Sequence, residues 1–97
     1  MRQGVHIEVL ALVDTAFPGS VECSLVDASG VEWRFVEKLP VVLDTHEFHL
    51  EFLPRPGVLA CVIVRREEGD VVTIETDVAC TTGQTVFQVR ATQLHEL

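Results

Sequence analysis

Apolar residues in this chain recur with a period of two, and this period constrains the fold more than any other feature of the sequence. Near the N-terminus His6 and Glu8 point to one face, while the other face collects Val5, Ile7, Val9, Ala11 and Val13. Such alternation is typical of a β-strand with one side buried and the other exposed to solvent. The pattern returns at residues 21–25, 31–35 and 85–91.

Turn signals separate these segments at short intervals. They are "TAFPGS" with Pro18-Gly19, "DASG" (27–30), "PRPG" (54–57), "RREEGD" (65–70) and "TTGQ" (81–84). Short strands between such turns predict a small sandwich or barrel. We therefore expect residues 1–97 to form one all-β domain, an antiparallel β-barrel or β-sandwich of six to seven short strands with at most one short helix.

Three segments lead to more specific expectations. Residues 58–64 are apolar throughout, which predicts the most buried strand, covered on both faces. The final "TQLHEL" is expected to be a tail. In residues 44–53, Asp44 is a possible helix cap, yet His46, Phe48 and Leu50 also alternate with polar residues, so helix and strand both remain open.

The stretch "GVEWRFVEKLPVVL" (30–43) contains the only tryptophan of the chain. Val31, Trp33 and Phe35 share one face, which we assign to the core, while Glu32 and Arg34 point outward. Pro40 lacks an N–H, so the strand is expected to end, bulge or lie at an edge near Leu39, and Lys38 favours the edge because a charge discourages further pairing. The stretch is thus predicted to be structural rather than a base-stacking surface.

The charge balance limits the possible partners. Seven Lys and Arg residues stand against fifteen Asp and Glu residues, which gives a net charge of −8 and a pI near 4.8. Binding to nucleic acid or to an anionic membrane draws on a basic surface, so we expect neither partner. Acidic residues cluster at 44–51 and 67–77, and such clusters suit a partner protein with a basic surface.

The three cysteines, Cys23, Cys61 and Cys80, form no CxxC pair and lie among apolar or small residues. Free buried cysteine behaves as a small hydrophobic residue, which predicts a reducing, cytoplasmic location. His6 and Glu8 interrupt the first apolar run, so we do not expect a signal peptide. No run of eighteen apolar residues predicts a membrane helix.

Asp44, His46, Glu47 and His49 are all competent metal ligands and lie together in sequence. Their two histidines are three residues apart, not four as in the zinc-protease motif, and no cysteine adjoins them. His6 and His95 lie far from this segment and from each other. The sequence therefore predicts no catalytic, cofactor or metal residue and favours a non-enzymatic protein, without deciding the question.

The layout of residues 20–43, "SVECSLVDASGVEWRFVEKLPVVL", and of residues 54–64, "PRPGVLACVIV", resembles small uncharacterised bacterial proteins built as compact all-β barrels. In architecture the chain is similar to the second, β-barrel domain of translation elongation factors, although it lacks their GTP-binding domain. In size and charge it also resembles small acidic immunity proteins that neutralise a bacterial toxin. These resemblances imply a barrel fold and no particular site residue.

Three functions remain open at this point. The leading hypothesis is a binding or accessory module for a basic protein, such as an immunity-type inhibitor. The second is a barrel that binds a small molecule or a metal near His46 and His49, with or without an enzymatic activity. The third is a structural protein that forms a homodimer through an edge strand.

Overall fold

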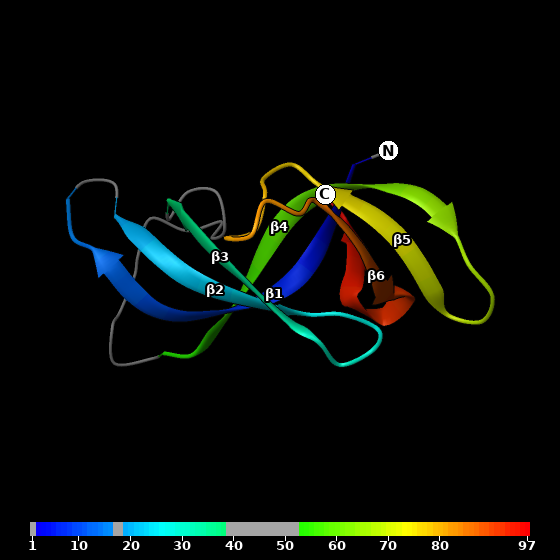
Figure 1. The fold of residues 1–97 in the computed structure, drawn as a ribbon, viewed down its shortest axis with the longest axis horizontal. Coiled ribbons are helices and arrows are strands. Elements are labelled where there is room, and N and C mark those ends of the chain that lie inside the picture. The colour runs from blue at the N-terminus through cyan, green and yellow to red at the C-terminus, as the bar shows by residue number, and fades with distance from the viewer. Residues whose placement is uncertain (1, 17–18, 39–52) are drawn as a thin grey trace.

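The computed structural model describes residues 2–16, 19–38 and 53–97, and the described strands form one antiparallel sheet (Figure 1). The strand order is β3-β2-β1-β4-β5-β6, with β7 paired to β1. The strands are β1 (Arg2–Asp14), β2 (Ser20–Val26), β3 (Glu32–Lys38), β4 (Arg55–Arg66), β5 (Val71–Thr76), β6 (Val86–Arg90) and β7 (Leu94–Glu96). The predicted all-β class is confirmed, and the 3-10 turn η2 (Ala91–Gln93) is the only helical element in the described ranges.

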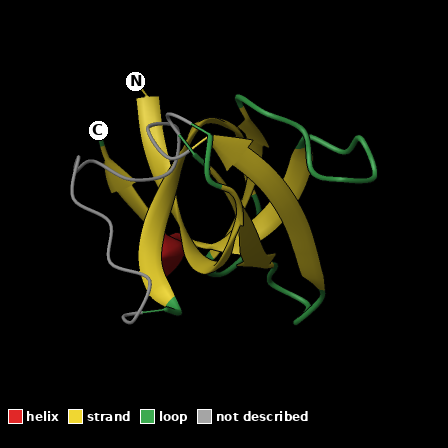
Figure 2. Ribbon diagram, turned by 90° about the vertical axis from the view of Figure 1, so that its left-hand side faces the viewer, coloured by secondary structure: helices red, strands yellow, loops and turns green. Residues whose placement is uncertain are grey.

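The sheet curls into a half-barrel (Figure 2). The long strand β1 pairs with β4 over Arg2 to Val9 and with β2 from Glu8 onward, and its β-bulges lie in the part that pairs with β2. Bulges bend a strand and increase its twist, so β1 can belong to both halves of the curled sheet. The strands are not uniformly short, because β1 has 13 residues and β4 has 12.

Contacts outside the strand ladders join the two ends of the sheet. The backbone N–H of Thr81 donates to the carbonyl of Arg34 on β3, and the N–H of Ala28 donates to the carbonyl of Gln88 on β6. Loop residues thus use backbone hydrogen-bonding groups of β3 and β6, the two terminal strands. Fewer of these groups are left for an added strand to pair with. The prediction that the strand before Lys38 is an edge strand is confirmed, while Pro40 lies outside the described residues.

The core fills the concave side of the sheet with alternating residues from six strands. Its fully buried side chains are mostly β-branched or aromatic, which suits a pleated surface. The largest are Phe35, Leu25, Leu59, Ile74, Val5, Val9, Val21, Val72 and Val89. Cys23, Cys61 and Cys80 are also buried and free, as the sequence predicted.

The turn "DASG" is built around one carboxylate. Asp27 accepts hydrogen bonds from the backbone N–H groups of Ser29 and Val31 and from Nε1 of Trp33. Gly30 adopts a φ of 84°, a conformation that side chains other than glycine rarely adopt. The turn joins β2 to β3 in the register that places Phe35 opposite Cys23.

The predicted core face of β3 is confirmed only in part. Phe35 is fully buried, and Trp33 packs against the core while remaining half-buried. Val31 is 48% exposed because it precedes the strand and belongs to the turn beyond the edge of the core. Phe87 of β6 contacts both rings, with centroids 5.5 Å from Trp33 and 5.9 Å from Phe35.

Two predictions for β4 are wrong. Arg55, Pro56 and Gly57 do not form a turn but begin the strand opposite β1, at a point where β5 does not yet pair with β4. A proline fits there because no second neighbour needs its missing N–H. The strand is also not covered on both faces, because Val62 and Val64 are 39% and 58% exposed.

The C-terminal residues are not a tail. After η2, β7 pairs with β1 by setting His95 opposite Gly4. A Cβ atom on Gly4 would clash with Val58 and lie 3.0 Å from Leu97 and 3.2 Å from His95. Glycine at this position therefore allows the C-terminal side chains to lie across β1.

Candidate interaction surface

The convex side of β1, β2 and β3 carries charged and apolar side chains, and we call it the β1–β3 face. Strand register aligns Glu8 with Ser24 and Arg34, and it aligns Ala11 with Glu22 and Val36. Asp14, Ser20 and Lys38 form a third row, and Val26 pairs with Glu32. On this face, four carboxylates therefore stand against two cations.

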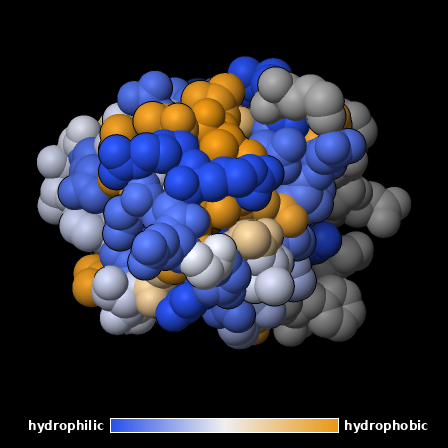
Figure 3. Space-filling view, turned by 90° about the vertical axis from the view of Figure 1, so that its right-hand side faces the viewer, coloured by the Kyte–Doolittle hydropathy of each residue, from blue (hydrophilic) through white to orange (hydrophobic). Residues whose placement is uncertain are grey.

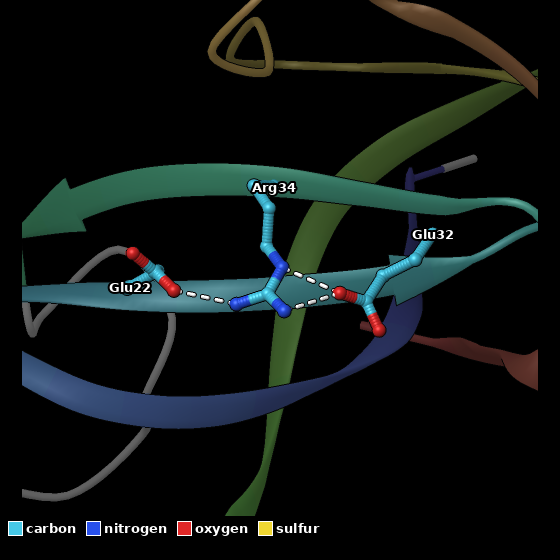
Figure 4. A network of polar contacts seen from close by, with 3 residues as sticks. All are labelled: Glu22, Glu32 and Arg34. Atoms are coloured by element: carbon cyan, nitrogen blue, oxygen red, sulfur yellow. Dashed lines mark hydrogen bonds and ion pairs between the residues drawn. The ribbon is translucent and has the colours of Figure 1, made fainter.

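Arg34 lies between two of these carboxylates (Figure 4). Its Nη1 atom is 2.5 Å from Oε1 of Glu22 on β2, and its Nη2 atom is 2.5 Å from Oε1 of Glu32 on β3. All three side chains are more than a third exposed, so the pairs add little stability. Glu22 and Glu32 neutralise the positive charge of the Arg34 guanidinium, and the net charge of the whole face stays negative.

Exposed valines lie beside this network. Val26 and Val36 are each 47% exposed, and register places Val36 directly opposite Glu22 and Val26 opposite Glu32. Apolar side chains among charged ones form the kind of mixed surface that protein interfaces use. The β1–β3 face thus combines apolar contact area with an excess of negative charge.

Ion pairs offset part of the negative charge of the second predicted acidic cluster, residues 67–77. Arginines pair with three of its carboxylates, in the pairs Arg65–Glu67, Arg90–Asp70 and Arg2–Asp77. Figure 3 views the end of the molecule that holds the β4–β5 hairpin and shows apolar surface between hydrophilic side chains. Folding thus brings Arg2 and Arg90 from distant parts of the chain to this cluster, while Glu68 and Glu75 add two further carboxylates.

Two of the cysteines are unsuited to chemistry. Burial, reinforced by the negative charges of Glu37 and Glu22, raises the pKa of Cys23 to about 12. Burial and Asp77 raise the pKa of Cys61 to about 11, against a smaller opposing effect of Arg2. The reactive thiolate is therefore suppressed at both positions.

Cys80 differs from the other two cysteines. Burial acts to raise its pKa, but hydrogen bonds from the Thr82 side chain and from backbone groups of the "TTGQ" turn outweigh it and lower the pKa overall. The Sγ atom lies 3.1 Å from Oγ1 of Thr82. No base or acid partner accompanies this thiol among its described contacts, so the arrangement does not form a catalytic pair.

The structure does not describe residues 39–52. The predicted candidate ligands therefore lie outside the described residues, namely Asp44, His46, Glu47 and His49, and so does the segment for which helix and strand both remained open. Within the described part of the chain, no group of three or more His, Cys, Asp and Glu side chains is arranged to hold a metal ion. His6 and His95, which appear scattered in the sequence, lie side by side, with Nε2 of His6 3.1 Å from Nδ1 of His95.

Comparison of the chain with known family models, with curated proteins and with solved structures finds no match. The resemblance to bacterial barrels and to immunity proteins therefore stays a prediction. Among the residues that the structure describes, no helix is long and apolar enough to cross a membrane.

Proposed function

We propose that this protein is a non-enzymatic binding module whose β1–β3 face docks against a basic surface of another protein. The observation that carries the proposal is the Arg34 network. Because Glu22 and Glu32 neutralise the arginine, the rest of the face keeps its carboxylates for a partner. Complementary charge speeds and orients such an association.

An immunity-type inhibitor is one concrete form of this function. The carboxylates of the face would cover a basic active site in a target enzyme, and Val26 and Val36 would add apolar contact. Such a complex has a 1:1 stoichiometry, and its affinity falls as salt screens the charges.

The test is a tagged pull-down from native cells at low salt with two matched variants. Glu8→Gln/Asp14→Asn removes the two exposed carboxylates of the β1–β3 face that do not pair with Arg34, and Glu68→Gln/Glu75→Gln removes two exposed charges elsewhere. We expect the wild type and the second variant to capture one stoichiometric basic protein that raised salt releases, and the first variant to lose it. No such partner, or equal capture by both variants, would contradict the proposal.

A further inference from the structure

We propose that His6 and His95 form a two-ligand site for a divalent transition-metal ion of the Ni²⁺ or Cu²⁺ type. The site lies on the same side of β1 as Glu8, at the part of the strand that β7 joins, and the argument for it does not depend on the proposed function. It brings together β1 and β7, from opposite ends of the chain.

Strand pairing sets the two imidazoles beside each other. His95 lies opposite Gly4 on β1, so His6, two residues further along the same face of β1, is its diagonal neighbour. The missing side chain at Gly4 allows His95 to approach, since Nε2 of His95 lies only 3.2 Å from the place of a Cβ atom. Both histidines are exposed, so an ion can reach them from solvent.

The ring geometry fits a shared ion. The two facing nitrogens are 3.1 Å apart and the ring centroids 4.7 Å apart, with an angle of 51° between the ring planes. Two imidazoles that bind one ion at about 2.1 Å, with their nitrogens this close, would have ring centres about 4.8 Å apart. In the metal-free protein these two nitrogens share a hydrogen bond, and the ion would take the place of the shared hydrogen.

The same distances indicate which ions fit. Nitrogens 3.1 Å apart around one ion subtend an angle of about 95°, nearer to the cis angle of square-planar or octahedral coordination than to a tetrahedron. Cu²⁺ and Ni²⁺ favour such geometries, and both bind imidazole. No third His, Cys, Asp or Glu completes the set within the described residues, so water would fill the other positions.

The experiment is a calorimetric titration of the untagged protein with Ni²⁺ at neutral pH, because Ni²⁺ does not oxidise the free cysteines. We expect one ion per chain in the wild type. Because each histidine is one arm of a chelate, His6→Gln and His95→Gln should each weaken binding about 10²-fold. A thermal scan should show that Ni²⁺ raises the melting temperature of the wild type more than that of either variant.

Two control variants separate this site from the other possible ligands. Cys80→Ser and His46→Gln/His49→Gln should bind Ni²⁺ as the wild type does. The proposal is overturned if the wild type binds no Ni²⁺, if binding survives both His6→Gln and His95→Gln, or if either control abolishes it. Circular dichroism of each variant confirms that the β fold is retained.

Discussion

Asp27 makes the β2–β3 turn sensitive to acid. Although partial burial acts to raise the pKa of this carboxyl, hydrogen bonds from Trp33, Val31, Ser29 and Gly30 prevail and lower it. A lowered pKa in the folded state stabilises the fold above the unfolded-state pKa of 3.8, and this contribution is lost as the pH falls through the folded-state value.

Asp27→Asn should therefore destabilise the protein at neutral pH by about 1–2 kcal/mol, because an amide cannot accept from all the donors around it. It should also reduce the loss of stability in acid. Urea unfolding of both proteins at neutral and acidic pH measures the two effects. Trp33→Phe, which removes one donor, should give an intermediate acid response. An unchanged pH dependence in Asp27→Asn would show that this carboxyl is not the acid-sensitive group.

The cysteines should differ in reactivity. At mildly alkaline pH, iodoacetamide should modify Cys80 first, because its pKa is lowered, whereas Cys23 and Cys61 stay protonated. Because the folded-state pKa values of Cys23 and Cys61 are raised above 9.0, stability should fall as the pH rises from 9.0 toward about 11–12. Mass mapping of the labelled sites gives the order, and early labelling of Cys23 would contradict the account.

Strand β3 has one buried and one exposed face, and substitutions on the two faces should differ in their effect on stability. Phe35→Ala removes a fully buried ring and should cost about 3–5 kcal/mol. Val36→Ala, on the exposed face, should cost no more than about 0.5 kcal/mol. Chemical denaturation measures both, and similar costs at the two positions would show that the faces of β3 are assigned wrongly.

Strand β7 depends on the missing side chain at Gly4. Gly4→Val should push Val58, Leu97 and His95 away from β1 and release the C-terminal residues from the sheet. Amide hydrogen exchange should show faster exchange in β7 and little change in β5 and β6. Unchanged protection of β7 in Gly4→Val would mean that the close contact at Gly4 does not hold this strand in place.

Most of the elements were predictable because the period of two reports burial directly. The wrong predictions concern segments whose structure depends on a neighbouring strand rather than on the local sequence. Pro56 reads as a turn residue, yet it is accommodated in β4 because only β1 pairs with it there. Val62 and Val64 read as doubly buried, but no second layer covers the convex side of β4. The short β7 has no hydrophobic pattern of its own and exists through its pairing with β1.

The candidate sites were less predictable than the elements. Glu32 and Arg34 are predicted to point outward, but only the register of β2 and β3 brings Glu22 beside them. His6 and His95 are adjacent in space and 89 positions apart in sequence. Residues that become neighbours across strands form no motif in the sequence. The composition therefore predicts that the surface is acidic, but it does not predict where the acidic surface lies.

For the whole molecule, the net charge of −8 is distributed unevenly. In the described part, four arginines form ion pairs: Arg2, Arg65 and Arg90 pair with carboxylates of residues 67–77, and Arg34 pairs with Glu22 and Glu32. With Arg66 included, residues 65–77 together with Arg2 and Arg90 hold five carboxylates and four arginines, a net charge of −1, whereas the β1–β3 face carries −2. A basic partner would be steered toward that face, and the steering would weaken with salt.

The most direct test of this account is an NMR titration of the ¹⁵N-labelled protein with the basic partner that the pull-down identifies, at low salt. We expect the largest backbone shift changes at Glu22, Glu32 and Val36 on the β1–β3 face, and small ones at Glu75 and Val86 on β5 and β6. Changes centred on β5 and β6 would contradict the assignment of the binding surface.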